Sequence, residues 1–373
     1  MVNFLSVRRA TRKTSRRLRE VRLVARALKS PRHPILAQIV PIRRCNLSCA
    51  YCNEYDKTSE PIRTEAMLRR IDRLAVLGTS MIDISGGEPL LHPDLDAIIR
   101  RIRQRGIIAS LLTNGYLLTR ERIERLNDAG LDRLQISIDN VTPSDVSHKS
   151  LKVLDAKLQL LAAHAEFDIN INTVVGAVVG DPEDALTIAR RGLALGFNAS
   201  VGLIHDSHGQ VAVLTDRHRE VYHEILGLTR SFYSHGHDEL FQGNLADGRP
   251  NHWHCRAGAR YLYICEDGLV HWCSQQRGYP AKPLDEYNQE DLERELSTTK
   301  SCAPYCTVSC VHRVALVDRL RERPMDTIDA LVAGRAAEGG PTPMTVKLLV
   351  WTFLSGPHQR AMRRFAGWTL GAR

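Results

Sequence analysis

The amino-acid sequence predicts an α/β fold built on parallel strands, followed by a small cysteine-rich region. The first observation is an alternation of short β-rich runs and amphipathic stretches, repeated six times between Leu36 and Ile204. Strands that alternate with helices in this way form a parallel sheet or a barrel. The second observation is the placement of the nine cysteines: three lie within residues 45–52 and six within residues 255–310. From residue 251 onward the pattern indicates hairpins and metal ligands.

Each expected strand is a short apolar run between polar or glycine-containing segments. The stretches between strands carry apolar residues three and four positions apart, as Leu95, Ile98 and Ile102 do. Glycines such as Gly130 follow these stretches, where a helix end favours a residue that tolerates positive φ. In such folds functional residues collect at the C-terminal ends of the strands. The expected strands are Ala37–Ile42, Met81–Ser85, Ile107–Leu112, Arg133–Ile138, Asp168–Val175 and Ala199–Ile204, and a later helix is expected over Asp216–Phe232.

The chain has 373 residues and a formal charge of +9, and this charge belongs to its two ends. Residues 1–30 hold ten bases and one acid, residues 345–373 hold five bases and no acid, and the part between carries −5. No apolar run is long enough to cross a bilayer, and the composition is that of a folded protein. The basic N-terminal segment lacks the order of a secretory signal, although it is similar to a transit peptide. We therefore expect a cytoplasmic protein whose cysteines bind metal rather than form disulfides.

Three cysteines follow the first expected strand on one loop. Cys45, Cys49 and Cys52 have the spacing CxxxCxxC. A structural zinc site takes four ligands, so three thiolates without a nearby histidine fit it poorly. A 4Fe–4S cluster can leave one iron without a protein ligand, and that iron can bind a substrate or cofactor. The alternative is a zinc knuckle completed by a ligand from elsewhere in the chain.

This loop, with Tyr51 before its third cysteine, resembles the motif of the radical S-adenosylmethionine (radical SAM) superfamily. Five further segments on successive strands strengthen the resemblance: a GGEP loop, a TNG loop, a Ser-Ile-Asp strand end, the fifth strand and the sixth strand. In that family the GGEP loop receives the methionine ammonium group, and polar side chains on the later strands contact ribose, methionine carboxylate and adenine. The cofactor-binding residues that the resemblance implies are Gly86, Gly87, Glu88, Pro89, Thr113, Asn114, Ser137, Asp139 and Asn172.

The resemblance covers roughly residues 36–204 and implies a partial (βα)6 barrel of TIM type. It also implies a 4Fe–4S cluster with an open iron site and reductive cleavage of S-adenosylmethionine. The resulting 5′-deoxyadenosyl radical abstracts a hydrogen atom from the substrate. A one-electron reductant of the flavodoxin or ferredoxin type is the expected partner. The catalytic residues stay open, and so does the choice among an oxidoreductase, a transferase and a lyase.

The second group of cysteines is similar to the opening of a SPASM/Twitch extension. Cys255, twelve residues, Gly268, four residues and Cys273 match the segment in which a hairpin delivers two ligands to an auxiliary 4Fe–4S cluster. Later cysteines would complete the set, and two auxiliary clusters are the alternative to one. Cys265 is surplus, as a strand residue or, alternatively, as a further ligand or hydrogen-atom donor. The metal ligands expected in all are Cys45, Cys49, Cys52, Cys255, Cys273, Cys302, Cys306 and Cys310.

Both ends of the chain combine basic and apolar residues. Residues 11–29 are expected to form a helix with Leu18, Val21, Ala25 and Leu28 on one stripe. Near the other end, the range 346–354 is apolar and is followed by arginines and tryptophan. Such elements suit a peripheral membrane contact, and the alternative is that they pack on the body of the protein. Binding of tRNA is a weaker third interpretation, because the sequence contains no recognisable nucleic-acid module.

The sequence thus predicts four segments. Residues 1–35 form the basic helix, 36–250 the radical SAM core, 251–335 the auxiliary Fe–S region with an α+β structure, and 336–373 a linker and basic tail. The predicted function is that of a radical SAM enzyme acting on a peptide, a small molecule such as a sugar or aminocyclitol, or a lipid-like substrate. The alternatives are an RNA-modifying radical SAM enzyme and a non-catalytic Fe–S or zinc protein.

Overall fold

Nine strands form one sheet in the computed structural model, which describes residues 4–176, 181–205, 211–228 and 238–337. Their order is β6-β5-β4-β3-β2-β1-β7-β8-β9, and the neighbours from β6 to β7 are all parallel. The parallel α/β prediction is therefore confirmed. The strands are β1 (Leu36–Ile39), β2 (Met81–Ile84), β3 (Ile108–Thr113), β4 (Arg133–Ser137), β5 (Asp168–Val175), β6 (Asn198–Leu203), β7 (Tyr261–Ile264), β8 (Leu269–His271) and β9 (Pro280–Pro283).

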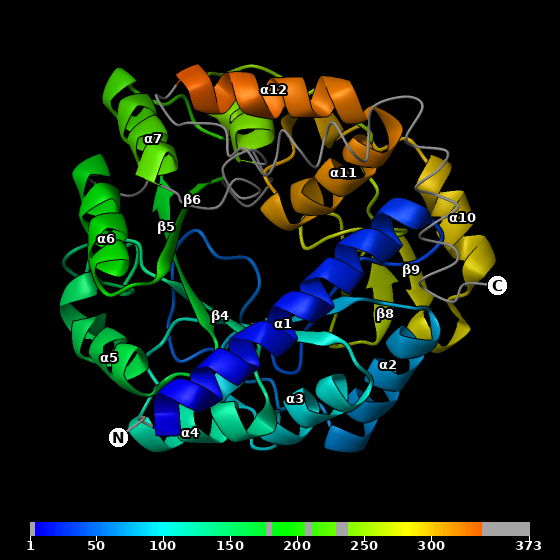
Figure 1. Ribbon diagram of the computed structural model, residues 1–373, viewed down its shortest axis with the longest axis horizontal. Helices are drawn as coiled ribbons and strands as arrows, with labels where there is room; N and C mark the ends of the chain where they lie inside the picture. Colours follow the sequence, from blue (N-terminus) through cyan, green and yellow to red (C-terminus); the bar gives the residue numbers. More distant parts are fainter. Residues whose placement is uncertain (1–3, 177–180, 206–210, 229–237, 338–373) are drawn as a thin grey trace.

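Helices cover the outer face of the curved sheet, as a view into the barrel shows (Figure 1). The main hydrophobic core lies between the two layers, where strand residues such as Ile82 and Ile84 are buried with Leu74 and Ile98 of the helices. Thr119 accepts a hydrogen bond from the amide of Arg122 at 3.2 Å and so begins one of these helices. They are α2 (Thr64–Val76), α3 (Leu95–Gln104), α4 (Arg120–Ala129), α5 (Leu151–His164), α6 (Pro182–Ala194) and α7 (Asp216–Leu228).

The inner face of the sheet is polar. Strand residues alternate between the faces, so the neighbours of the outward core residues point into the barrel. TIM barrels usually fill this space with bulky apolar side chains. Here polar side chains of adjacent strands are hydrogen-bonded to one another: Gln38 of β1 donates to Ser85 after β2 at 2.7 Å, and Asn170 of β5 donates to Ser200 of β6 at 2.7 Å. The inward residues of the first five strands include Gln38, Asp83, Ser110, Gln135 and Asn170.

The cysteine-rich region extends the same sheet. Strand β7 pairs with β1 in parallel, with Leu36 opposite Tyr261, and β8 and β9 follow in antiparallel order. Gly268 has φ +81° at the turn between β7 and β8, which confirms the predicted hairpin. The remaining elements are η2 (Asp238–Gly243), α9 (Asn244–Ala246), α10 (Gln289–Ser297), the short 3₁₀ helices η1 (Pro89–Leu91), η3 (Leu284–Glu286) and η4 (Ala303–Tyr305), α11 (Ser309–Glu322) and α12 (Pro324–Ala337).

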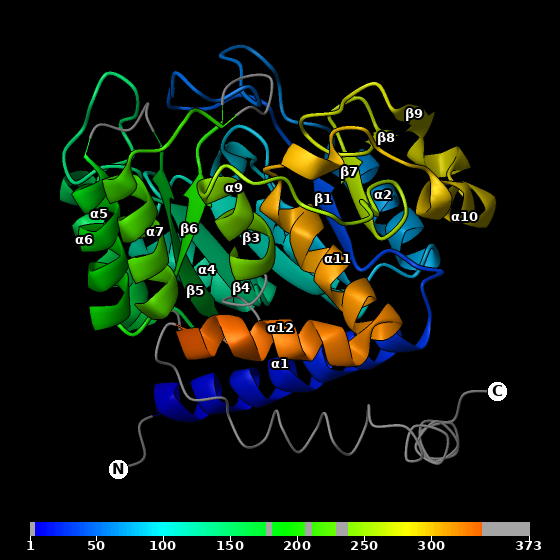
Figure 2. The ribbon, with the colours of Figure 1, turned by 90° about the horizontal axis from the view of Figure 1, so that it is seen from above.

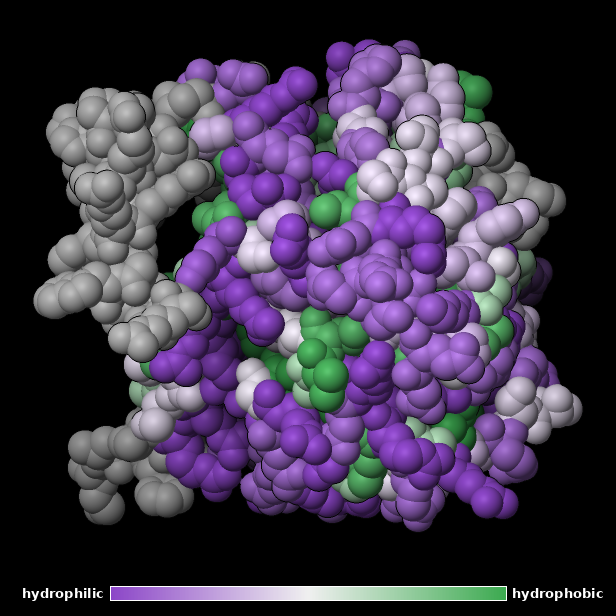
Figure 3. Space-filling view, turned by 90° about the vertical axis from the view of Figure 1, so that its right-hand side faces the viewer, coloured by the Kyte–Doolittle hydropathy of each residue, from purple (hydrophilic) through white to green (hydrophobic). Residues whose placement is uncertain are grey.

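Helix α1 (Phe4–Lys29) crosses the end of the barrel at which the strands begin (Figure 2). It is longer than the expected helix over residues 11–29, and it contacts α11. The face on the right of Figure 1, over α2 and α10, is largely hydrophilic with small, separated apolar patches (Figure 3). Among the described residues no helix has the length and apolarity needed to span a membrane. The apolar stretch 346–354 and the rest of the predicted tail lie outside the described residues.

Candidate functional site at the mouth of the barrel

The three-cysteine loop follows β1 and folds back on itself. The amide of Cys45 donates to the carbonyl of Asp56 at 3.0 Å, and the amide of Asp56 donates to the carbonyl of Arg43 at 3.1 Å. Lys57 also donates to the carbonyl of Leu47 at 2.8 Å, which ties the middle of the loop to its end. Cys49 is buried, whereas Cys45 is partly exposed. The backbone therefore holds the thiols on one compact loop at the strand ends.

Two glycines of the GGEP loop allow this loop to pack against the cysteine loop. Gly86 has φ +125°, and a Cβ atom there would lie 2.4 Å from the carbonyl oxygen of Ile42. At Gly87 a Cβ atom would lie 2.1 Å from the carbonyl oxygen of Arg43. The amide of Gly87 donates to the carbonyl of Ile42 at 3.0 Å. The absence of a side chain at these two positions therefore lets the GGEP loop approach the backbone of the cysteine loop closely.

Glu88 connects the GGEP loop to the TNG loop. Its Oε1 accepts hydrogen bonds from the Thr113 hydroxyl at 2.8 Å and from the Leu90 amide at 2.9 Å, and its Oε2 accepts one from the Asn114 amide at 2.8 Å. The side chain is fully buried, and burial raises the pKa of its carboxyl group against the opposing effect of these donors. Asn114 Nδ2 in turn lies 3.7 Å from the Sγ of Cys45. The two predicted loops and the first cysteine therefore form one connected unit.

A second buried network surrounds Cys49. Asp139 Oδ2 accepts hydrogen bonds from Tyr51 at 2.5 Å and from Ser147 at 2.6 Å, and the Lys149 ammonium lies 3.0 Å from it. The hydroxyl of Ser147 lies 3.6 Å from the Sγ of Cys49. Burial alone would lower the pKa of Lys149, but Asp139 and Tyr51 raise it well above its usual value. The network thus places a positive charge beside the thiols.

Two members of this network were not found from the sequence. Ser147 and Lys149 lie in the segment between β4 and α5, which carries no motif. Asp139 was predicted, and its Oδ1 is buried without a hydrogen-bond partner among the described residues. A buried carboxylate oxygen without a donor is costly, so this atom has capacity to accept a bond from a bound group.

The remaining predicted residues lie on neighbouring strands. Ser137 at the end of β4 stands opposite Asn172 on β5. The Oδ1 of Asn172 accepts a hydrogen bond from Ser200 of β6 at 2.9 Å. The structure therefore brings the predicted strand-end residues of β2 to β5 to one edge of the sheet, beside the cysteine loop.

The six later cysteines divide into separate environments. The pKa of Cys306 is raised well above its usual value, first by burial and then by the nearby thiols of Cys273, Cys255 and Cys302. The same group appears around Cys273, whose pKa burial raises to about 12, with Cys255 and Cys302 contributing. Four thiols of the hairpin and of the η4 segment therefore form one group.

Cys310 has different neighbours. Burial raises its pKa to about 12, and the charged groups that act on it are Asp83, Arg313 and Glu54. Asp83 is an inward residue of β2, so the Cys310 thiol lies toward the barrel interior.

The spacing of the thiols bears on which metal they suit. One tetrahedral zinc ion would hold its cysteine sulfurs about 3.8 Å apart, given Zn–S bonds of about 2.3 Å. In the described part of the chain no three of the eight predicted cysteine ligands have sulfurs within 4.8 Å of one another. This wider spacing suits a polynuclear cluster better than a single zinc ion.

Comparison with known proteins identifies the core. Residues 39–190 match the model of the radical SAM superfamily. This range includes the cysteine loop, the GGEP and TNG loops and the network around Asp139. The chain contains a radical SAM domain. Domains of this family bind a 4Fe–4S cluster and S-adenosylmethionine, and three thiols on one loop beside an orphaned carboxylate oxygen fit that pair.

Curated relatives match about a third of this chain. PqqA peptide cyclase of Gluconobacter oxydans is 35% identical over 118 residues, which is 31% of this chain and 32% of that protein. The AdoMet-dependent heme synthase of Methanosarcina barkeri is 34% identical over 140 residues, which is 35% of this chain and 40% of that protein. The chain thus matches about a third of the length of these relatives.

Solved structures share the fold over a longer range. SuiB of Streptococcus suis has a TM-score of 0.52 and 17% identity, covering 78% of this chain and 75% of that one. The structure of anSMEcpe with bound AdoMet and a peptide has a TM-score of 0.51 and 14% identity. The match covers 82% of this chain and 97% of that one. The similarity therefore extends beyond the radical SAM domain and supports the predicted fold class.

Cys265 lies outside the four-thiol group. It is fully buried at the end of β7, within 4.8 Å of ligand atoms of Asp267 and His271. However, the amide of Gly278 donates to His271 Nδ1 at 3.0 Å, so the proton of the neutral ring resides on Nε2, which faces Asp267 at 3.4 Å. A metal ion bound at Nε2 would move the ring proton to Nδ1. There it would point at the N–H of Gly278, so two donors would face each other. The trio is therefore better suited to a hydrogen-bonded cluster than to a metal site.

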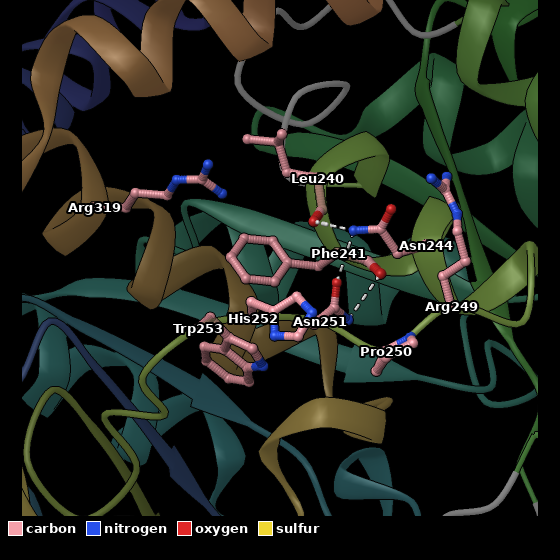
Figure 4. Close-up of a pocket in the computed structure, with 9 residues that line it drawn as sticks. All are labelled: Leu240, Phe241, Asn244, Arg249, Pro250, Asn251, His252, Trp253 and Arg319. Atoms are coloured by element: carbon pink, nitrogen blue, oxygen red, sulfur yellow. Dashed lines mark hydrogen bonds between the residues drawn. The ribbon is translucent and has the colours of Figure 1, made fainter.

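A cavity of about 430 Å³ is lined by residues of the range 240–253 and by Arg319 of α11. Figure 4 shows the guanidinium groups of Arg249 and Arg319 on opposite sides of it, with Phe241 and Trp253 between them. Trp253 Nε1 donates to the carbonyl of Ala303 at 2.7 Å, which connects the cavity wall to the segment between Cys302 and Cys306. The cavity combines aromatic surface with positive charge.

Proposed function

We propose that this chain is a radical SAM enzyme whose core cluster is held by Cys45, Cys49 and Cys52. The observation that carries this proposal is the closure of the cysteine loop on the GGEP and TNG loops through Gly86, Gly87 and Glu88. When bound, the reduced cluster supplies the electron that cleaves S-adenosylmethionine to methionine and a 5′-deoxyadenosyl radical, which abstracts a substrate hydrogen atom.

The residues of the chain would hold and shield these groups. Glu88 already accepts three hydrogen bonds from the protein, so its remaining acceptor capacity is one site for the methionine ammonium. Lys149 supplies a buried positive charge near the Cys49 thiol. Asp139, Ser137 and Asn172 present polar atoms at the same edge, with Asp139 Oδ1 able to accept a further donor.

We further propose one auxiliary 4Fe–4S cluster on Cys255, Cys273, Cys302 and Cys306. Their mutual proximity supports this ligand set, and the different surroundings of Cys310 support leaving it out. Among the substrate classes expected, a peptide is favoured by the similarity to a peptide cyclase and to structures solved with bound peptides. The polar inner face of the barrel also favours a polar substrate over a lipid-like one.

Anaerobic reconstitution with iron and sulfide, followed by dithionite and S-adenosylmethionine, tests the proposal. We expect 5′-deoxyadenosine from the wild-type chain and none above background from Cys45→Ala. Iron should approach about eight per chain for two clusters, and about twelve would indicate three. A reconstituted chain that binds iron but forms no 5′-deoxyadenosine, with or without candidate peptides, would contradict the enzyme assignment and leave an iron–sulfur carrier.

A further inference from the structure

Several arginines on one side of helix α1 point toward the protein. Arg12 Nε lies 2.7 Å from Glu166, and Arg16, whose side chain is only 4% exposed, pairs with Asp168. The acidic partners stand where the strands begin, since Asp168 is the first residue of β5. The ion pairs between α1 and the barrel are Arg8 with Asp128 and Glu166, Arg12 with Glu166, Arg16 with Asp168, Arg19 with Asp132, and Glu20 with Arg133.

The opposite face of the same helix is apolar and exposed. Leu18 is 53% exposed, Val21 65% and Val24 45%. These three lie at spacings of three residues, so they share one side of the helix. The stripe predicted from the sequence therefore exists, but it faces solvent at Leu18 and Val21 and reaches the protein only where Leu28 is partly buried.

Exposed cations flank this apolar stripe. Four basic residues of α1 are exposed beside the stripe, and no ion pair found among the described residues includes any of them. Glu20 is the single acid of the helix, and it is paired with Arg133 on the inward side. The four cations are Lys13, Arg17, Arg22 and Lys29, whereas the guanidinium of Arg26 lies against Gly78 on the body of the protein. The outer face of α1 thus carries an apolar stripe with basic side chains beside it. Leu18, Val21 and Val24 form this stripe, which is called the α1 stripe below.

Charge decides among the surfaces that could cover the α1 stripe. A second copy related by a two-fold axis would bring the same cations together, which is repulsive. The C-terminal residues 345–373 of this chain carry five bases and no acid, so they would meet like charge as well. A nucleic acid would pair with the cations but would leave the apolar side chains in water. An anionic lipid surface satisfies both features at once.

We propose that α1 lies in the headgroup region of an anionic membrane, with the α1 stripe toward the acyl chains and the flanking cations on lipid phosphates. The helix crosses the end of the barrel opposite the cysteine loop (Figure 2). Membrane contact through α1 therefore leaves the mouth of the barrel facing the aqueous phase, from which the substrate enters. This binding does not depend on the proposed function.

Vesicle flotation with the full-length, reconstituted chain tests the proposal. Vesicles of phosphatidylcholine alone are compared with vesicles that contain about one third phosphatidylglycerol, at about 0.1 M NaCl. We expect binding to the anionic vesicles at least about ten-fold stronger than to the neutral ones, and weakened by added salt. The variant Leu18→Ser/Val21→Ser should lower binding to anionic vesicles by about ten-fold or more.

The matched control is Val76→Ser/Val153→Ser, which removes two exposed valines from α2 and α5. It should bind vesicles as the wild type does. Circular dichroism and 5′-deoxyadenosine formation report whether each variant is folded and whether the core chemistry is intact, so failure of membrane binding is distinguishable from failure of the proposed enzyme.

Three results would overturn the proposal. One is anionic binding that Leu18→Ser/Val21→Ser does not change. Another is tighter binding to polyuridylate than to vesicles, lost when Arg17 and Arg22 become glutamine, which would indicate a nucleic-acid surface. The third is a dimer, seen by light scattering, that the Leu18→Ser/Val21→Ser variant dissolves.

Discussion

Replacing Glu88 by glutamine tests whether this carboxylate stabilises the fold or acts only in binding S-adenosylmethionine. The side chain is fully buried, and its two oxygens accept hydrogen bonds from Thr113, Leu90 and Asn114 at 2.8 to 2.9 Å. Glutamine offers one oxygen in place of two. If that oxygen keeps the bonds from Thr113 and Leu90, the new NH2 group faces the amide of Asn114, and two donors meet.

The expected loss in the free energy of unfolding follows from the removal of a buried hydrogen-bond acceptor. A hydrogen bond to a charged group contributes about 1.5–3 kcal/mol, and a buried donor left without a partner costs about 1–3 kcal/mol. These two estimates describe overlapping effects, so a loss of about 2–3 kcal/mol is expected. Since 1 kcal/mol corresponds to about 2–4 °C in domains of 150–250 residues, the unfolding midpoint should fall by about 5 °C or more.

Thermal unfolding under anaerobic conditions without S-adenosylmethionine measures this loss. The control is Glu286→Gln, an exposed position on η3. We expect Glu88→Gln to unfold at a lower temperature and Glu286→Gln to behave as the wild type. An unchanged midpoint for Glu88→Gln, together with lost binding of S-adenosylmethionine, would refute the reasoning, because the carboxylate would then act on the ligand alone.

Three further predictions concern buried charge and cluster ligands. Burial lowers the pKa of His33 to about 3, with nearby arginines contributing. The contribution of the buried neutral imidazole to the free energy of unfolding is therefore complete above pH 6.5 and is lost as the pH falls toward 3. At pH 5 this loss is about 2 kcal/mol. The free energy of unfolding in urea should therefore change less between pH 7 and pH 5 for His33→Gln than for the wild type. An equal change in both proteins would contradict this. Asp318→Ala leaves Arg260 buried without its partner at 3.1 Å and should cost about 3–5 kcal/mol in denaturant unfolding, whereas a loss below about 1 kcal/mol would show that water reaches the guanidinium. Cys310→Ser should retain the wild-type iron content while Cys306→Ser loses about four irons per chain, and the reverse result would exchange their roles.

The sequence was sufficient to predict the strands of the barrel because their pattern is local. Each of the six predicted strand segments overlaps a strand of the structure, and the hairpin turn at Gly268 is where the Asp-Gly pair indicated. The GGEP and TNG residues meet for the same reason, since the carboxyl ends of neighbouring parallel strands share one edge. A motif at a strand end therefore predicts its neighbours without knowledge of side-chain contacts.

The network around Cys49 could not be predicted in this way. Ser147 and Lys149 stand on an irregular segment whose path depends on tertiary contacts, such as the hydrogen bond from the amide of Ala50 to the carbonyl of Val146 at 2.9 Å. Likewise, three cysteines with equal spacing after residue 300 do not reveal which two join Cys255 and Cys273. The proposed choice rests on the groups around each thiol, because Asp83, Arg313 and Glu54 act on Cys310 whereas Cys273, Cys255 and Cys302 act on Cys306.

Helix α1 shows why an amphipathic pattern does not by itself tell which face is buried. A helix with one apolar and one basic side normally buries the apolar side, because burial of unpaired charge is costly. Here Asp132 and Asp168 stand at the beginnings of β4 and β5, where the barrel presents carboxylates to Arg19 and Arg16. The pairs make burial of the basic face tolerable, and Leu18, Val21 and Val24 are left outside. Only near its C-terminal end does the helix bury apolar residues, where Ala27 packs in the core with the partly buried Leu23 and Leu28. The basic N-terminal segment is thus partly a structural complement to an acidic barrel end, and only its unpaired cations remain available to a membrane.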